Sequence, residues 1–324
     1  MIYSKTPYRI SLFGGGTDFP EWFENNKSLV ITTSINKYAT IGIRYLPSFF
    51  EKKNRIIWSK IELVNSINRI KHPAIKAILK KYNEINGIEL YHYGDLPARS
   101  GIASSSAFVV GLLNLMNFIN KKKISKFELS KQATLIEHKI LKEDGGLQDQ
   151  IITSVGGFKE ISFYKKEIKY KEICVNEKKI KEINSSLLLL YTGGFRKSYL
   201  IQKEFKKNIK NLSRELRLIN QIATEAKKII LSEKNYDEIG YLLNESWKIK
   251  KKFNKKISNS KIHDIYDTAI KSGATGGKML GAGSKGFMIL YCPTHRKNKI
   301  LTNLKKLVHI PFLFENKGTH IINI

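Results

Sequence analysis

The segment Pro97–Ala107 reads PARSGIASSSA and separates a predicted strand, Ile88–Tyr93, from a strongly apolar helix, Phe108–Ile119. Glycine lets backbone N–H groups converge on an anion, serine side chains cap helices, and the first turn of a helix carries partial positive charge. The segment is therefore typical of a phosphate-binding loop, although it matches neither the G-x-x-x-x-G-K-[ST] loop nor the G-x-G-x-x-G fingerprint. A Ser-rich helix cap without a ligand is the structural alternative.

Two further segments are rich in glycine. Leu12–Asp18 reads LFGGGTD and places an acid beside a glycine turn, and Gly273–Gly286 reads GATGGKMLGAGSKG, with six glycines before a predicted strand. So many glycines lose conformational entropy on folding, which favours a loop whose backbone closely approaches a ligand or another segment. A simple turn and a flexible hairpin loop remain the respective alternatives.

Two carboxylates follow the phosphate-binding candidate in the sequence. Glu137 lies at the flank of the apolar stripe of a predicted helix, Ser125–Leu141, and Asp149 follows a Gly-Gly turn. Phosphoryl transfer depends on positioning, on a Mg²⁺ ion between the phosphates and on a base near the acceptor hydroxyl, and carboxylates serve both purposes. An ion pair of Glu137 with Lys131 or Lys139, and a cap of the next element by Asp149, are the alternatives.

The composition is that of a folded protein with an excess of basic residues. The 324 residues include 57 Lys+Arg against 28 Asp+Glu, a net charge of +29, and 42% are apolar, which excludes intrinsic disorder. The lysines are scattered, so a solvated surface and a functional charge for anionic ligands both stay open. Cys174 and Cys292 provide no disulfide framework or metal site, and no run of about 18 apolar residues occurs. We therefore expect a soluble, cytoplasmic protein without a membrane contact.

The order of the predicted elements indicates an α+β fold with two domains, residues 1–184 and 185–324. Hydrophobic periodicity separates the strands from the helices, and glycine turns punctuate them. The predicted strands are Ile2–Leu12, Leu29–Tyr45, Ile56–Val64, Ile88–Tyr93, Leu187–Tyr191, Phe287–Cys292 and Ile310–Phe314, with others within Gly157–Val175. The predicted helices are Pro73–Tyr82, Phe108–Ile119, Ser125–Leu141, Ser198–Ser232, Tyr236–Phe253 and Lys261–Ser272, with another after Pro293.

The combination of four segments is more specific than any one of them. PYRISLFGGGTD, DLPARSGIASSSA, IEHKILKEDGGLQDQ and GATGGKMLGAGSKG follow one another along nearly the whole chain, and in this order and spacing the sequence resembles the GHMP kinase superfamily. The resemblance implies a two-domain GHMP kinase fold, with a left-handed βαβ crossover in the N-terminal domain, a ferredoxin-like C-terminal domain and an active site between them. It also implies ATP as the phosphate donor and Mg²⁺ as the metal ion.

The resemblance implies roles for individual residues. Ser105, in preference to Ser106, is expected to hold Mg²⁺ together with Glu137. Asp149, within a Gly-x-x-Asp-Gln match, is expected to orient or deprotonate the acceptor hydroxyl, and Arg9 to neutralise charge near the transferring phosphoryl group. Gly273–Gly286 is expected to pack against the phosphate loop. The expected phosphate-binding residues are Pro97, Ser100, Gly101, Ile102, Ala103, Ser104, Ser105 and Ser106.

The acceptor is implied by the sugar kinases within the superfamily. Galactokinases usually read Gly-Glu-His-Thr-Asp in the first motif, so Gly-Gly-Gly-Thr-Asp argues against galactose itself. This version, Gly-Leu-Gln-Asp-Gln and the segment Leu190–Arg196 resemble kinases of D-glycero-D-manno-heptose 7-phosphate, which phosphorylate an anomeric hydroxyl for nucleotide-activated heptose and surface polysaccharide. Another anomeric sugar kinase, of galactose, fucose or uronate type, is the alternative. The expected sugar contacts are Gly15, Gly16, Thr17, Asp18 and Arg196.

Two alternatives to an active kinase come from other functional classes. A nucleic-acid-binding protein would use the basic charge, but no RNA-recognition signature occurs and the basic residues are not interleaved with aromatic ones. A catalytically inactive kinase acting as a sensor is disfavoured because Arg9, Ser105, Glu137 and Asp149 are all present. The sequence thus favours an enzyme with ATP and a small sugar or sugar phosphate as partners, and it leaves a homo-oligomer open.

Overall fold

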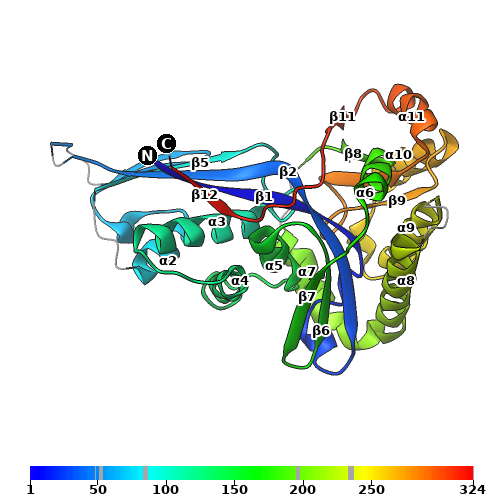
Figure 1. Ribbon diagram of the computed structural model, residues 1–324, viewed down its shortest axis with the longest axis horizontal. Helices are drawn as coiled ribbons and strands as arrows, with labels where there is room; N and C mark the ends of the chain where they lie inside the picture. The colour runs from blue at the N-terminus through cyan, green and yellow to red at the C-terminus, as the bar shows by residue number, and fades with distance from the viewer. Residues whose placement is uncertain (48, 51–53, 83–86, 195–197, 233–236, 324) are drawn as a thin grey trace.

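Two β-sheets and the helices packed on them form the part of the chain that the computed structural model describes, which is every residue except 48, 51–53, 83–86, 195–197, 233–236 and 324 (Figure 1). The first sheet has eight strands and the second has four. Helices and strands alternate irregularly along the chain, so the prediction of an α+β fold is confirmed.

The first sheet is built around one long strand, β2, which pairs with β6 through its first half and with β5 through its second half. The strand order is β12-β1-β2-β5-β3-β4, with β6 paired to β2 and β7 to β6. The parallel neighbours β3 and β5 are connected through β4 and the helix α2. The strands are β1 (Ile2–Phe13), β2 (Ser28–Tyr45), β3 (Asn54–Ile57), β4 (Ile61–Val64), β5 (Ile88–Gly94), β6 (Phe158–Tyr164), β7 (Glu167–Glu172) and β12 (His320–Asn323).

The second sheet has the order β11-β8-β10-β9, and each neighbouring pair is antiparallel. Four α-helices, α7 to α10, connect β8 to β9, and α11 connects β10 to β11. The elements of this sheet follow the order strand, helical segment, two strands, helix and strand, as in a ferredoxin-like domain. The strands are β8 (Leu187–Tyr191), β9 (Gly276–Met279), β10 (Phe287–Tyr291) and β11 (Val308–His309).

Helices pack on both sheets, and those of the C-terminal half cover both faces of the second sheet. In Figure 1, α2, α3 and α4 lie below the first sheet, and α8 and α9 lie on the side of the second sheet. None of the described helices combines the length and the apolar character needed to cross a membrane. The α-helices are α1 (Pro20–Phe23), α2 (Pro73–Lys81), α3 (Ser104–Ile119), α4 (Lys126–Leu135), α5 (Gln148–Val155), α6 (Glu177–Ser185), α7 (Ser198–Asn208), α8 (Ser213–Leu231), α9 (Asp237–Lys250), α10 (Ser260–Lys271) and α11 (Lys297–Asn303). The 3₁₀ turns are η1 (Ile67–Arg69), η3 (Ile209–Leu212), η4 (Lys255–Ile257) and η5 (Thr294–Arg296), and η2 (Ile136–Ile140) is a π-helical turn.

Three predicted elements were wrong in their extent. Ile56–Val64 is not one strand but a hairpin of β3 and β4. The backbone N–H of Trp58 donates to the carbonyl of Lys60 and closes its turn. The predicted helix over Ser198–Ser232 is interrupted by η3. The predicted terminal strand Ile310–Phe314 reduces to one bridge between Phe314 and Ile35, with β11 before it and β12 after it.

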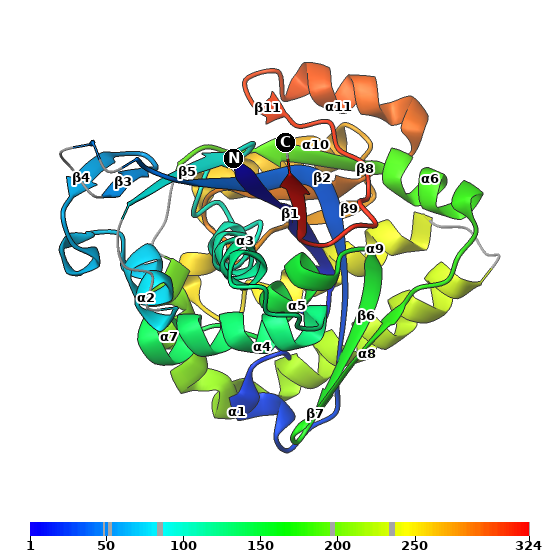
Figure 2. The same cartoon turned by 60° about the vertical axis from the view of Figure 1, so that its left-hand side comes forward.

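The C-terminal segment returns to the first sheet. Strand β12 pairs antiparallel with β1, and a buried hydrogen bond of 2.7 Å joins Thr319 to Thr6. Figure 2 shows the two termini side by side, with β12 against β1. The last strand therefore lies with the first sheet, although its residues belong to the predicted domain 185–324.

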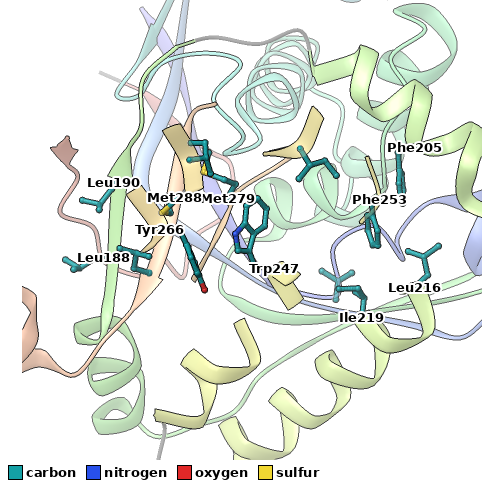
Figure 3. Close-up of a cluster of buried hydrophobic side chains, with 14 of the residues drawn as sticks. Leu188, Leu190, Phe205, Leu216, Ile219, Trp247, Phe253, Tyr266, Met279 and Met288 are labelled. Carbon is teal, nitrogen blue, oxygen red and sulfur yellow. The ribbon is translucent and has the colours of Figure 1, made fainter. Parts of the chain in front are cut away.

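The hydrophobic core is continuous between the two sheets. Side chains of β8, β9 and β10 pack against Trp247 and Tyr266, and Phe205 stacks on Phe253 with ring centroids 5.1 Å apart (Figure 3). The same cluster includes Trp22 and Ile152 from the N-terminal half. Because apolar burial drives these contacts, the two halves are held together at the edge of the cavity described below.

Two histidines support the first turns of α3, the helix that follows the phosphate-binding segment. The rings of His72 and His92 lie 5.0 Å and 4.8 Å from the ring of Phe108, measured between centroids. Among the described residues, His92 Nε2 is buried without a hydrogen-bond partner. Burial, reinforced by His72, lowers the pKa of His92 to about 4, and burial also lowers the pKa of His72.

We predict that His92→Phe makes the protein more resistant to acid. Between pH 6.5 and 4 the unfolded chain binds a proton at this histidine and the folded protein does not, so the wild type loses stability as the pH falls through this range. The variant has no histidine to titrate at this position. Between pH 6.5 and 5 its free energy of unfolding should therefore fall by roughly 2 kcal/mol less than that of the wild type. Urea denaturation at the two pH values measures the difference. An equal loss in both proteins would show that His92 is protonated in the folded state.

Candidate active site

A cavity of about 510 Å³ opens between the two sheets and brings together segments far apart in the sequence. It is lined from the N-terminal half by β1, the first glycine turn, the start of α3, η2 and the start of α5, and from the C-terminal half by α7, α9, β9 and the loop after β9. The predicted site residues that line it are Arg9, Gly15, Gly16, Asp18, Gly101, Ala103, Ser104, Ser105, Ser106, Glu137 and Asp149.

The predicted phosphate loop enters α3 through two left-handed residues, Gly101 (φ +92°) and Ala103 (φ +61°). Gly101, Ala103 and the first three residues of α3 line the cavity, and the dipole at this end of the helix favours an anion. Three predicted residues do not line the cavity. Ser100 and Ile102 are fully buried, and the Ser100 hydroxyl donates to the carbonyl of Pro97 at 2.5 Å. Pro97, Ser100 and Ile102 therefore support the loop on the side away from the cavity.

The third glycine-rich motif packs directly on the phosphate loop. The backbone N–H of Phe287 donates to the Ser100 carbonyl at 3.1 Å, and a Cβ atom at Gly286 would lie 2.1 Å from the same oxygen. Only glycine fits this approach, because the backbones touch and Gly286 has φ +102°. From the same loop, Gly281 and Ala282 line the cavity.

Glu137 is a buried carboxylate directed at the start of α3. The π-helical turn η2 carries it, and such turns are frequent at functional sites. Its Oε2 accepts hydrogen bonds from Ser106 Oγ at 3.0 Å and from Gln150, and its Oε1 is buried without a partner among the described residues. Burial raises the pKa of Glu137 to about 8.

The serine that contacts Glu137 is Ser106, whereas Ser105 faces a second carboxylate. Ser105 Oγ donates to Glu143 Oε2 at 3.3 Å. Consecutive helical residues point about 100° apart, so only one of the two serines can face Glu137. The unpartnered oxygen of Glu137 beside a serine hydroxyl fits Mg²⁺, which takes oxygen ligands and is bound through one or two carboxylates together with substrate phosphates. The residues present therefore suit the metal ion.

Arg9 and Asp149 form a bidentate ion pair at the cavity wall. Arg9 Nε donates to Asp149 Oδ1 and Nη2 donates to Oδ2, each at 2.7 Å. The third donor, Nη1, reaches the carbonyl of Gly101 at 2.8 Å. Asp149 lies in the first turn of α5, whose N-cap is Leu147, so it does not cap that helix. The pair thus connects β1, the phosphate loop and α5.

Asp18 is buried where the first glycine turn meets α5. Its carboxylate accepts hydrogen bonds from the backbone of Gly16 at 3.0 Å and from the side chain of Gln148 at 3.0 Å. Burial, reinforced by the charge of Asp149, raises the pKa of Asp18. Thr17 does not line the cavity, because its hydroxyl donates to the carbonyl of Gly14 and closes the turn. The predicted Arg196 lies outside the described residues.

The sequence analysis missed several polar residues of the cavity, among them Ser11, Gln148 and Lys278. Ser11 Oγ and Gln148 Oε1 are buried and have no partner in the described part of the chain. Lys278, on β9, is buried with 3% of its surface exposed. Ser11 stands two residues after Arg9 on the same strand face, so the period of two could have indicated it. Lys278 is the one lysine within the glycine-rich stretch 273–284, but nothing in the sequence orients it.

We predict that Gly146→Ala weakens acceptor binding. A Cβ atom at Gly146 would lie 1.9 Å from Asp18 Oδ2 and would displace that carboxylate. The KM for the acceptor should rise roughly 10- to 100-fold, since small displacements of positioning groups cost that much, with a smaller change in the KM for the nucleotide. Gly145→Ala is the matched control, because its Cβ would meet Gln202 Nε2 at an ordinary 3.6 Å. Equal effects of the two substitutions would show that Asp18 takes no part in binding the acceptor.

Comparisons with known proteins agree with this architecture. A model of the GHMP kinases N-terminal domain matches residues 67–157. The chain is 29% identical to a D-glycero-alpha-D-manno-heptose 7-phosphate kinase of Campylobacter jejuni, over 94% of this chain and 93% of that protein. It is 22% identical to a galactokinase of Pyrococcus furiosus, over 89% of this chain and 88% of that one.

Solved structures share the fold over their whole length. A D-glycero-D-manno-heptose 1-phosphate kinase from Bacteroides thetaiotaomicron superposes with a TM-score of 0.82 and 24% identity, covering 100% of this chain and 99% of that one. A Lactococcus lactis galactokinase complexed with galactose has a TM-score of 0.76 and 18% identity, covering 98% of this chain and 95% of that one. With the four motifs gathered in one cavity, residues 67–157 match the GHMP kinases N-terminal domain and the whole chain shares its fold with these kinases.

Proposed function

We propose that the chain is an ATP-dependent sugar kinase that phosphorylates the anomeric hydroxyl of D-glycero-D-manno-heptose 7-phosphate, giving the 1,7-bisphosphate. The observation that carries phosphoryl transfer is one cavity in which the phosphate loop, the buried Glu137 and the Arg9–Asp149 pair meet. The choice of sugar is supported by the 29% identity to the Campylobacter heptose kinase over nearly the whole chain. We assign the reaction to the cytoplasm, where ATP is available.

The donor site is formed by the N-terminus of α3. Backbone N–H groups from Gly101 to Ser106 would bind the phosphates of ATP, where the helix dipole and the left-handed loop residues favour an anion. Ser106 and Glu137 would hold Mg²⁺, with Ser105 and Glu143 beside them. When bound, the metal ion neutralises charge on the phosphates.

The acceptor site lies on the other side of the Arg9–Asp149 pair. Ser11, Asp18 and Gln148 offer buried polar atoms to sugar hydroxyls, and two of these atoms have no partner among the described residues. Asp149 would accept the proton of the attacking hydroxyl, because each carboxylate oxygen keeps a second lone pair beside its bond to Arg9. Direct in-line transfer then needs no covalent intermediate on the protein.

We predict that Asp149→Asn lowers turnover strongly. Loss of a general base typically costs a factor of about 10²–10⁴ in kcat. ATP affinity should change little, because Arg9 keeps its hydrogen bond to the carbonyl of Gly101 in the phosphate loop. Steady-state kinetics together with nucleotide titration separate the two effects. Asp264→Asn, an exposed residue of α10, is the matched control. Near-wild-type turnover of Asp149→Asn would exclude this residue as the base.

The two neighbouring serines provide a second test. Ser106→Ala should raise the Mg²⁺ concentration needed for half-maximal rate by roughly 10- to 100-fold, because it removes the hydroxyl that contacts Glu137. Ser105→Ala should have a smaller effect, because Ser105 faces Glu143. Rates measured over a Mg²⁺ titration decide between them. A larger effect at Ser105 would restore the assignment expected from the sequence.

The sugar is tested by an ATP-consumption screen. The wild type is assayed with Mg²⁺ on free and 7-phosphorylated heptoses, mannose, galactose, fucose and glucuronate, and the product is analysed by ³¹P NMR. We expect turnover on a heptose 7-phosphate with the new phosphate on the anomeric carbon. Turnover on a free hexose alone would support a sugar kinase but contradict heptose 7-phosphate as its substrate. No ATP turnover with any sugar would contradict the proposed function.

A further inference from the structure

Lys278 is a buried cation in the cavity without an opposite charge. It lies on β9 opposite Ile289 of β10, with 3% of its surface exposed, and it lines the cavity. In the part of the chain that the structure describes, no carboxylate lies within 4.0 Å of its Nζ atom and no hydrogen bond is assigned to it. Burial, reinforced by the positive charges of Lys250 and Arg9, holds the pKa of Lys278 well below its ordinary range.

The two neighbouring cations are engaged by the protein itself. All three nitrogens of Arg9 contact Asp149 or the carbonyl of Gly101, and Lys250 Nζ donates to the carbonyl of Gly281 at 2.5 Å. A buried charge without a partner is costly, and a lysine that only filled space could be replaced by an apolar residue of similar length. Lys278 therefore has a donor group available for an anion that enters the cavity.

Arg9 indicates where that anion lies. It contacts Gly101 of the phosphate loop and Asp149 of the acceptor side, so it marks the place where donor and acceptor meet. Lys278 is close enough to Arg9 for the two charges to interact. The phosphate already present on a heptose 7-phosphate is at the opposite end of the sugar from the reacting hydroxyl. The anion at this place is therefore the phosphoryl group that is transferred.

We propose that Lys278 binds the terminal phosphoryl group of ATP and stays with it during transfer. The acceptor oxygen forms a bond to the γ-phosphorus, the bond from the γ-phosphorus to the β,γ-bridging oxygen breaks, the hydroxyl proton goes to Asp149, and ADP leaves with the bridging oxygen. Lys278 supplies positive charge to the non-bridging oxygens and forms no covalent bond. This inference rests on the proposed function, both on the phosphoryl transfer and on the position of the phosphate in the proposed sugar.

The test compares two nucleotides in the absence of sugar. Binding of ADP and of the non-hydrolysable ATP analogue AMP-PNP, each with Mg²⁺, is measured by calorimetry for the wild type, Lys278→Met and Lys278→Arg. Lys271→Met, at an exposed position of α10, is the matched control. We expect Lys278→Met to weaken AMP-PNP roughly 10- to 100-fold, the effect of one lost charged hydrogen bond, and to leave ADP nearly unchanged. Lys278→Arg should recover part of the loss.

Each other result has a distinct meaning. Equal weakening of both nucleotides, or no weakening of either, would overturn the inference, and so would a variant that binds AMP-PNP normally but raises only the KM for a phosphorylated sugar. If Lys278→Met does not fold, as judged by thermal unfolding, the ratio of AMP-PNP to ADP affinity in Lys278→Arg decides in the same way. A wild type that binds neither nucleotide would instead contradict the proposed function.

Discussion

The geometry of the active site depends on the ion pair between Arg9 and Asp149. One planar guanidinium holds both oxygens of Asp149 and the carbonyl of Gly101, and so fixes β1, α5 and the phosphate loop relative to one another. The backbone N–H of Arg9 adds a hydrogen bond to the carbonyl of Ile102 at 3.2 Å. Lysine would not provide this planar, forked set of donors. The candidate phosphate loop and the proposed base therefore meet at one residue of the first strand.

The cavity contains charges that a core of this kind would otherwise exclude. Glu137 and Asp18 are buried with raised pKa values, and Lys278 is buried with a lowered one, so each is shifted toward its neutral form. Such shifts cluster at functional sites, where a ligand or ion supplies the missing opposite charge. The glycines at Gly146 and Gly286 bring the surrounding backbone close enough to enclose these groups. Buried groups of this kind are what we expect of the proposed site, which would take phosphate, a metal ion and a sugar.

Much of the fold and most of the site could be predicted from the sequence. Strand β8 and helices α2 and α3 agree closely with their hydrophobic patterns, and all four motifs contribute to one cavity. The errors arose where the pattern is ambiguous: the β3–β4 hairpin reads as one strand, and the segment after Ile310 pairs with the first sheet through a single bridge. Neither the turn at Trp58–Lys60 nor the return of β12 has a strong local signal, because both depend on partners distant in the sequence.

The sequence by itself indicated the candidate phosphate loop and the candidate carboxylates, because glycine, serine and acid have local consequences for backbone conformation and charge. Its four motifs together gave the resemblance to GHMP kinases. The tertiary structure decided which groups meet. It directs Ser106 rather than Ser105 to Glu137, ties Arg9 to Asp149, and leaves Lys278 in the cavity without an opposite charge. These relations depend on contacts between segments that are far apart in the chain, 31 positions for Ser106 and Glu137 and 140 for Arg9 and Asp149. Side-chain periodicity shows which residues share a face of one element, and it does not show which distant residue lies opposite that face.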